Sequence, residues 1–134
     1  MTMTGGCLCG QVRYETDAAP AWTAICYCRD CQRASGSGHM PVMGMRRADM
    51  RITGETRSYV VAAQRGPSTR HFCPTCGSLI FGGVDGPPDE TMSVYVGTLD
   101  DPSAWSPKIA IFTRSRMPWD GAVAGATEFE TMPG

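Results

Sequence analysis

Short apolar runs separated by glycine- and proline-rich turn signals dominate the chain. Val12 and Tyr14 alternate with polar neighbours, which predicts a strand over residues 11–16. Further runs rich in β-branched and aromatic residues predict strands at residues 57–62, 79–81, 92–96 and 109–112. No run suits a long helix, and the best helical candidate is a single turn over residues 30–34. The pattern therefore predicts an all-β fold of short antiparallel, meander-like strands with one short helical turn.

Two further stretches, a methionine-bearing segment and the C-terminal end, carry predictions of their own. Met40, Met43 and Met45 follow one another along a further expected strand, and we expect them to fill core space. The last stretch, 121–134, is expected to be a C-terminal surface tail. At 134 residues the chain has the size of one domain, so we expect residues 1–134 to form a single one.

Composition and charge narrow the class of protein. The 42% hydrophobic and 19% charged residues are typical of a globular chain and exclude a disordered one. The beginning of the sequence lacks a signal-peptide pattern, and no apolar segment approaches the roughly 18 residues of a membrane helix. The net charge of −1 and the absence of a Lys/Arg run argue against nucleic acid as a partner. We expect a cytoplasmic protein with neither nucleic-acid nor membrane partners, and the sequence indicates no particular oligomeric state.

The chemistry of the chain is concentrated in its cysteines. The seven cysteines fall into three clusters, and their odd number disfavours a closed disulfide framework. In a reducing cytoplasm, closely spaced cysteines are more often metal ligands. Four protein ligands close a structural zinc tetrahedron, whereas three leave one position for water or substrate. A division of the seven into four and three therefore predicts one site of each kind.

The four-ligand set begins from Cys73 and Cys76, two thiols at metal-binding spacing that are followed by Gly77. The alternative is a redox dithiol, but such a motif usually precedes a helix, and a strand-like run follows here. Cys7 and Cys9 supply two further ligands. The complete set would clamp the N-terminal strand to a central hairpin and would contribute directly to folding.

The three-ligand set is Cys26, Cys28 and Cys31, with Arg29 and Arg33 beside it. Three thiolates on Zn²⁺ leave a formal charge of about −1. Nearby guanidinium groups could offset that charge or hold an anionic substrate. The alternative for these arginines is ordinary surface charge near a loop.

Two alternatives concern the metal itself. His39 or His71 could close the second site as a fourth ligand, although neither lies at a familiar spacing from the cluster. An iron–sulfur cluster is also compatible with thiolate ligands.

At this point the sequence resembles the family of the glutathione-dependent formaldehyde-activating enzyme and centromere protein V. The resemblance covers about residues 5–119 and rests on the order of the cysteine clusters, with weaker support later in the chain. The matching segments are Gly5-Gly-Cys-Leu-Cys-Gly10, Cys26-Tyr-Cys-Arg-Asp-Cys31 with Ser35-Gly36, Phe72-Cys-Pro-Thr-Cys-Gly77, Val96-Gly-Thr-Leu-Asp100 and Pro118-Trp119.

The resemblance implies a fold, two metals and an activity. The fold would be a zinc-bearing β-tent, and the chain would bind two Zn²⁺, one structural and one catalytic. The activity would be that of a carbon-sulfur lyase of the S-(hydroxymethyl)glutathione synthase type, acting on glutathione or another small thiol and a small aldehyde such as formaldehyde. The structural ligands would be Cys7, Cys9, Cys73 and Cys76, and the catalytic ligands Cys26, Cys28 and Cys31.

One segment departs from the family pattern. Members of the family often carry a histidine before the aromatic strand near Pro107, where this chain reads Ile109-Ala110-Ile111-Phe112. If that histidine helps to bind substrate in those members, the substrate of this chain differs from theirs.

Glutathione carries two carboxylates, which suit arginines near an open metal position. Arg29 and Arg33 are the local candidates for substrate binding, and Arg114 and Arg116 are more distant ones. Trp22 and Trp119 are candidates for lining a pocket, although aromatic residues at strand ends more often belong to the core or its rim. The residues that we expect to bind substrate are therefore Arg29, Arg33 and Trp119.

Two other classes of function remain open from the sequence. The protein could carry glutathione without accelerating chemistry, or it could be an interaction module in which both metals only hold the fold. An interaction module predicts a second site that is closed by protein and does not respond to thiols. A catalyst could bind either the thiol sulfur or the aldehyde oxygen at the open metal position.

Overall fold

The computed structural model describes residues 2–63 and 66–133. A three-stranded sheet has the order β1-β2-β5, with β1 at Met3–Gly6, β2 at Arg13–Thr16 and β5 at Arg51–Thr53. An eight-stranded sheet has the order β11-β10-β3-β4-β9-β8-β7-β6. Its strands are β3 (Trp22–Cys26), β4 (Met40–Arg46), β6 (Arg57–Ala63), β7 (Gly66–Phe72), β8 (Leu79–Gly82), β9 (Thr91–Tyr95), β10 (Ile109–Ile111) and β11 (Thr127–Glu128).

Helical structure in the described residues is limited to short pieces. The α-helix α1 spans Arg29–Ser35, and three 3₁₀ turns follow as η1 (Arg47–Asp49), η2 (Val96–Thr98) and η3 (Thr113–Ser115). None of the helices in the described part of the chain is long and apolar enough to cross a membrane.

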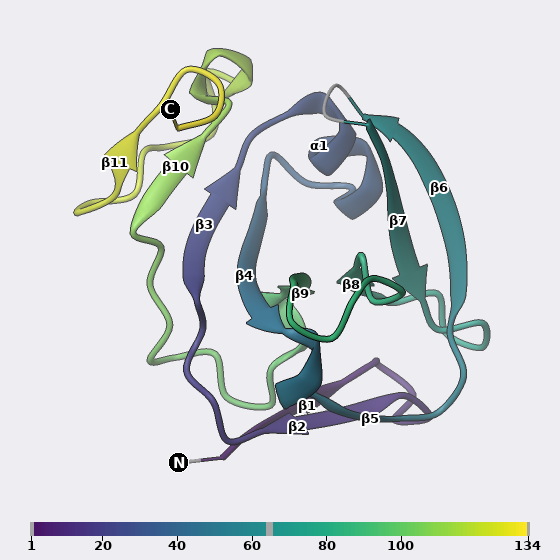
Figure 1. Cartoon of the computed structure of the whole chain (residues 1–134). Coiled ribbons are helices and arrows are strands. Elements are labelled where there is room, and N and C mark those ends of the chain that lie inside the picture. Colours follow the sequence, from purple (N-terminus) through teal and green to yellow (C-terminus); the bar gives the residue numbers. More distant parts are fainter. Residues whose placement is uncertain (1, 64–65, 134) are drawn as a thin grey trace.

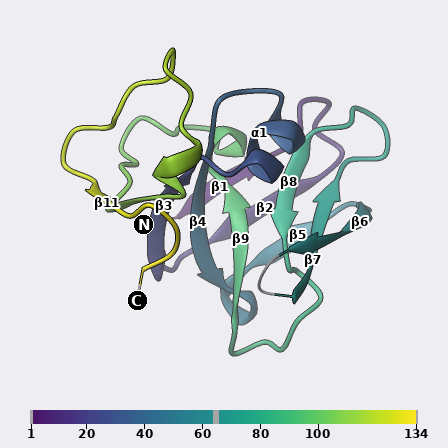
Figure 2. The same ribbon diagram turned by 90° about the horizontal axis from the view of Figure 1, so that it is seen from above.

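The large sheet is strongly curved. Figure 1 shows β6 and β7 standing opposite β3 and β4, with α1 at one end of the fold and the three-stranded sheet at the other. The view from above in Figure 2 shows β4, β9 and β8 side by side, in agreement with their pairing. The curvature leaves a concave face on the large sheet. Cys26 and Cys73 lie at the ends of its strands, whereas Cys7 and Cys9 follow β1 of the three-stranded sheet.

The sequence predicts the fold class correctly but not the whole topology. The predicted strands are confirmed as β2, β6, β8, β9 and β10, and the helical turn as α1. The expected all-antiparallel meander is wrong at one edge, because β10 runs parallel to both β3 and β11. The chain crosses from β9 to β10 by a long connection, which allows β10 to enter beside β3 in the same direction.

The main hydrophobic core fills the space between the two sheets. Tyr14 of β2 and Phe81 of β8 meet edge to face with ring centroids 5.4 Å apart. Met43 and Met45 of β4 are fully buried in this core. Met40 is also buried, but it lies in a second cluster around Cys26 and Cys31, because side chains alternate between the faces of a strand. The expected core role of the methionines is confirmed.

The segment that the sequence presents as a surface tail is mostly exposed, yet it is tied to the large sheet. β11 pairs with β10, and the backbone N–H of Phe112 donates to the carbonyl oxygen of Thr131 at 3.0 Å. Phe112 has a φ of 55°, in the left-handed region that is uncommon for a residue with a side chain. This turn directs the chain from β10 into η3, beside α1.

Candidate metal centres and ligand cavity

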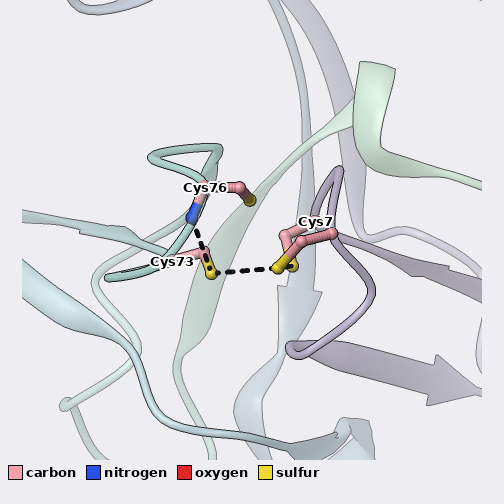
Figure 3. Close-up of side chains that lie close together, drawn as sticks. Cys7, Cys73 and Cys76 are labelled. Carbon is pink, nitrogen blue, oxygen red and sulfur yellow. Dashed lines mark hydrogen bonds between the residues drawn. The ribbon is translucent and has the colours of Figure 1, made fainter.

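The first cysteine group joins the two sheets. Cys7 and Cys9 lie on the turn after β1, and Cys73 and Cys76 lie on the turn between β7 and β8. Figure 3 shows Cys73 and Cys76 on one turn facing Cys7 on the other. The structure therefore brings together the four cysteines that the sequence predicts as one set.

The sulfur atoms of this four-cysteine cluster have the spacing of a tetrahedral metal site. Sγ of Cys9 lies 3.6 Å from Sγ of Cys7 and 3.7 Å from Sγ of Cys73. Zinc–sulfur bonds of about 2.3 Å at tetrahedral angles would separate the sulfur atoms by about 3.8 Å. The donor set and these two distances thus fit zinc, and all four sulfur atoms lie within 4.8 Å of one another.

Backbone and hydroxyl donors surround these sulfur atoms. The N–H of Val12 donates to Sγ of Cys7 at 3.3 Å, and the N–H of Cys76 donates to Sγ of Cys73 at 3.5 Å. Hydrogen bonds from the Ser78 hydroxyl and from backbone N–H groups lower the pKa of Cys76 to about 5. Donors of this kind stabilise thiolates, which are the form that binds metal.

The two cysteine turns are built alike. Each ends in a glycine in the left-handed region, Gly10 at φ 84° and Gly77 at φ 77°. In each, the glycine N–H donates to the carbonyl oxygen of the first cysteine, at 3.2 Å and 2.9 Å respectively. A side chain at either glycine would strain the turn that presents the sulfur atoms.

The second group is a cysteine triad at the C-terminal end of β3, where α1 begins. Cys26 ends β3, Cys28 is the N-cap of α1, and Cys31 lies within the helix. Their sulfur atoms lie within 4.8 Å of one another. The N–H of Cys31 donates to Sγ of Cys28 at 3.3 Å, so the sulfur caps the helix as it faces the other two. Three converging thiols of this geometry fit a zinc ion bound through three ligands.

No fourth protein ligand joins the triad among the residues that the structure describes. Nδ1 of His39 lies 2.7 Å from a carboxylate oxygen of Asp120. His71 is buried, with Nδ1 3.1 Å from the Thr56 hydroxyl and Nε2 3.1 Å from Asp85. Closure of this group by either histidine, an alternative left open by the sequence, is therefore wrong for this structure.

Arg70 of β7 reaches the triad, and sequence reasoning missed it. Its Nη2 lies 3.6 Å from Sγ of Cys31, and its Nη1 donates to the Tyr95 hydroxyl at 3.2 Å. The guanidinium also lies over the Tyr95 ring, 5.9 Å from the centroid. No local motif marks this arginine, because only the pairing of β7 with β8, and of β8 with β9, brings it to the triad.

The triad contains a thiol with a lowered pKa, which favours binding of a cation. Hydrogen bonds from the Cys26 and Cys31 thiols lower the pKa of Cys28 to about 2, and the positive charge of Arg70 acts in the same direction. Hydrogen bonds to Cys28 and Cys31 raise the pKa of Cys26, so this thiol shares its proton with the anionic partner. A divalent metal would replace such shared protons.

The triad opens onto a cavity of about 830 Å³ on the concave face of the large sheet. This volume lies toward the upper end of the range of about 300–1,000 Å³ typical of small-molecule sites. Arg29, Arg70 and Arg114 line the cavity, together with Tyr95 and Trp22. Of the predicted substrate residues, Arg29 thus faces the cavity, as do the further candidates Arg114 and Trp22.

Three other candidates do not line the cavity. Arg33 lies in the last turn of α1, outside the lining residues. Trp119 is 73% exposed and lies against Gly38, because the chain has already turned away after η3. Arg116 stacks on the Tyr27 ring at 4.5 Å. These three residues therefore lie outside the cavity lining, whereas Arg70 lies beside the triad.

Gln32 holds the arginine-bearing segments together. It is 5% exposed, and its Nε2 donates to the carbonyl oxygens of Tyr27 at 2.8 Å and Ser115 at 2.9 Å. Its Oε1 accepts a hydrogen bond from Arg29. The amide therefore fixes α1 against η3 and keeps Arg29 and Arg114 at the same end of the cavity.

The fold and the two cysteine groups define an all-β protein with one four-cysteine cluster and one open triad at a ligand cavity. The chain belongs to the glutathione-dependent formaldehyde-activating enzyme family, whose model matches residues 2–115. The resemblance seen in the sequence is therefore confirmed.

Two individual proteins are similar to this chain. A Halomonas elongata protein named as a glutathione-dependent formaldehyde-activating enzyme is 29% identical over 87 residues, which are 60% of this chain and 55% of that protein. The chain thus spans about half the length of this curated relative. The crystal structure of a Rhodobacter sphaeroides protein shares 25% sequence identity, has a TM-score of 0.56, and is matched over 78% of this chain and 92% of that one.

Proposed function

We propose that the protein is a zinc-dependent enzyme that joins a small thiol, glutathione in the first instance, to an aldehyde. The single observation that carries this proposal is the three-thiol triad, open on one side, at the end of a cavity that also presents three arginines. A purely structural metal site would need a fourth protein ligand, and none is found among the described residues. The family supports a role involving glutathione and formaldehyde.

The arginines suit the thiol substrate. Glutathione is anionic through its carboxylates, and guanidinium groups bind carboxylates through paired hydrogen bonds. Arg29 and Arg114 are held at the triad end by Gln32. In the proposal these two residues bind carboxylates, which places the substrate sulfur next to the triad.

The chemistry is an addition that needs no oxidant or reductant. The substrate sulfur forms a bond to the aldehyde carbon, the carbonyl π pair moves to the oxygen, and the proton lost by the thiol ends on that oxygen. The hemithioacetal therefore contains all atoms of the two reactants. Zinc held by Cys26, Cys28 and Cys31 would supply a Lewis acid at this end of the cavity.

The hydroxyl of Tyr95 can stabilise the negative charge that develops on the carbonyl oxygen of the aldehyde. Burial raises the pKa of Tyr95, so its hydroxyl stays protonated at neutral pH. Arg70 already donates to the hydroxyl oxygen, which leaves the O–H free to donate to another acceptor. A carbonyl oxygen placed in the cavity beside Tyr95 would gain this hydrogen bond.

The proposal is tested by titrating glutathione into protein whose zinc has been replaced by cobalt. We expect two metal ions per chain and an increase in the sulfur-to-cobalt charge-transfer absorption that saturates with glutathione. Oxidised glutathione, which has no free thiol, is the control and should leave the spectrum unchanged. An unchanged spectrum with reduced glutathione would favour the closed interaction module. A spectral change without any acceleration of hemithioacetal formation over the spontaneous rate would favour a carrier.

A second prediction concerns Arg70. Replacing it by methionine keeps most of the side-chain volume but removes the positive charge beside Cys31. We expect kcat/KM for the glutathione-dependent reaction to fall about 10- to 100-fold, since a hydrogen bond involving a charged group is worth about 1.5–3 kcal/mol. The cobalt spectrum of the ligand-free protein should shift as well, because the sulfur loses a donor.

Arg33→Met provides the matched control, because this arginine lies near the triad in sequence but outside the cavity. This variant should leave kcat/KM within about twofold and the cobalt spectrum unchanged, as expected for the loss of an exposed charge. Equal losses for the two variants would contradict a specific role of Arg70.

We further propose that residues 1–134 act as one domain and that the protein works in a reducing cytoplasm. All seven cysteines are free thiols in the structure. Closely spaced free thiols with metal-site geometry persist in reducing compartments, where disulfides are rare.

A further inference from the structure

The cavity extends well beyond the triad. Trp22, Ala24 and Cys26 share one face of β3, because side chains at every second position point the same way. Trp22 begins the strand and Cys26 ends it, so the two lie ~13 Å apart along the strand. A formaldehyde carbon at the triad would leave the Trp22 end unfilled.

Charge separates the two ends. The charged residues of the cavity lining are Arg29, Asp30, Arg70 and Arg114. Arg29 and Asp30 lie in α1, Arg70 contacts Cys31, and Arg114 lies in η3, which Gln32 ties to α1. Among the described residues, the charged groups of the lining thus lie at the triad end, and Arg70 reaches that end through its long side chain.

The Trp22 end is apolar or neutral. Among the described residues it is lined by Trp22 and Val42 together with Thr91 and Ser93 of β9 and Ile109 of β10. A charged part of a ligand would find no partner there, whereas an uncharged hydrocarbon group would be favoured by removal from water.

The sheet carries small residues beside Trp22 at this end. The strand pairing aligns Trp22 with Gly44, Gly44 with Ser93, Ser93 with Gly82, and Gly82 with Arg70, whose side chain extends from this row to Cys31. The row thus has small residues at its centre. Gly44 is required there, because a Cβ atom would lie 2.2 Å from the Trp22 indole, so the ring covers the glycine backbone. The indole thus lies over Gly44, and the small cavity-lining residues Ser93 and Gly82 continue the row beside it.

We infer that the Trp22 end is a subsite for an uncharged hydrocarbon substituent on the aldehyde carbon, so that the physiological aldehyde is larger than formaldehyde. This inference rests on the proposed function and names its substrate class. The thiol and its carboxylates occupy the arginine end, and the carbon that bonds to sulfur directs an alkyl or aryl group along β3 toward Trp22.

Calorimetric titration of the zinc-loaded protein with S-methyl-, S-butyl- and S-hexylglutathione tests the subsite. These conjugates are stable mimics in which the chain on sulfur takes the place of the aldehyde's substituent. Affinity should rise about tenfold or more from S-methyl to S-hexyl, because each fully buried methylene contributes about 0.8 kcal/mol. A flat series would overturn the inference.

Substitutions test whether the preference for longer S-alkyl chains depends on Trp22. Trp22→Ala should reduce the S-hexyl preference to about threefold or less while leaving the affinity for S-methylglutathione within about twofold. Trp119→Ala, an exposed tryptophan outside the cavity, should keep the full preference. Thr91→Glu puts a carboxylate at an exposed position of the subsite and should also lower the S-hexyl preference, which covers the case that Trp22→Ala does not fold. A preference retained in Thr91→Glu and in any folded Trp22→Ala protein would overturn the assignment.

The outcome also separates this inference from the proposed function. If reduced glutathione changes the cobalt spectrum but chain length has no effect on affinity, the subsite is wrong and the proposed function stands. If neither glutathione nor any conjugate binds, both are wrong.

Discussion

Replacing Cys76 by serine is expected to lower the Tm by roughly 10 °C or more, the largest stability effect of any single change considered for this protein. The four-cysteine cluster links the turn after β1 to the turn between β7 and β8, and zinc binding at such a site contributes directly to folding. Loss of one of four ligands should cost about 3 kcal/mol or more, a large part of the roughly 5–15 kcal/mol that holds a typical domain folded. Thermal unfolding followed by circular dichroism, with a metal count on the same sample, measures this.

The chelator dependence of the melting curve provides the control. In the wild-type protein, removal of metal should lower the Tm by at least as much as the substitution does. In Cys76→Ser the remaining effect of the chelator should be small. A Cys76→Ser protein that melts at the wild-type temperature would show that the cluster is not the structural site.

Replacing Cys28 by serine should instead reduce glutathione-dependent turnover about 100-fold or more while the protein stays folded. The substitution removes one of the three thiols at the cavity, and activity losses of this size are typical when a central catalytic group is removed. Helix α1 should survive, because Cys28 is its N-cap and serine is among the best N-cap residues. Steady-state kinetics, corrected for the spontaneous reaction of thiol and aldehyde, together with a metal count that falls from two to one, measures the effect.

The two serine variants control each other. Cys28→Ser should shift the Tm by only a few degrees, and Cys76→Ser should retain the triad's metal wherever it remains folded. If Cys28→Ser kept wild-type turnover, the reaction would have to be placed outside the triad. If it lowered the Tm as much as Cys76→Ser does, the division into a structural and a reactive site would fail.

Much of the candidate site could be predicted because cysteine chemistry is local in sequence. Cys26 and Cys28 lie in one short motif, and so do Cys73 and Cys76, so spacing alone indicates which thiols act together. The assignment of Cys7 and Cys9 to the second of these motifs follows from counting ligands, and the structure brings those sulfur atoms together.

The substrate-binding residues are harder to predict, because they depend on strand register. Arg70 lies 39 residues after Cys31 and reaches it only through the curvature of the large sheet. Arg33 and Trp119 lie near recognisable motifs, but the last turn of α1 and the chain after η3 face away from the cavity. Proximity in sequence is a good guide for the metal ligands and a poor one for the cavity wall.

The strands of the fold also differ in how well the sequence predicts them. Strands with a clear apolar pattern, such as β2 and β9, are recognisable. β7 is missed because its sequence, Gly66–Phe72, is mostly polar and owes its conformation to its neighbours β6 and β8. The parallel entry of β10 beside β3 depends on a long connection that carries no pattern of its own.

The separation of the cysteines along the chain also bears on the order in which metal is acquired during folding. The triad is closed within a few residues, so the emerging chain can assemble it early at little entropic cost. Cys9 and Cys73, in contrast, are 64 residues apart, and their meeting requires both turns and most of the large sheet to be in place. Refolding in limiting zinc should therefore load the reactive site before the structural one, and completion of the four-cysteine cluster should be the slow, committing step.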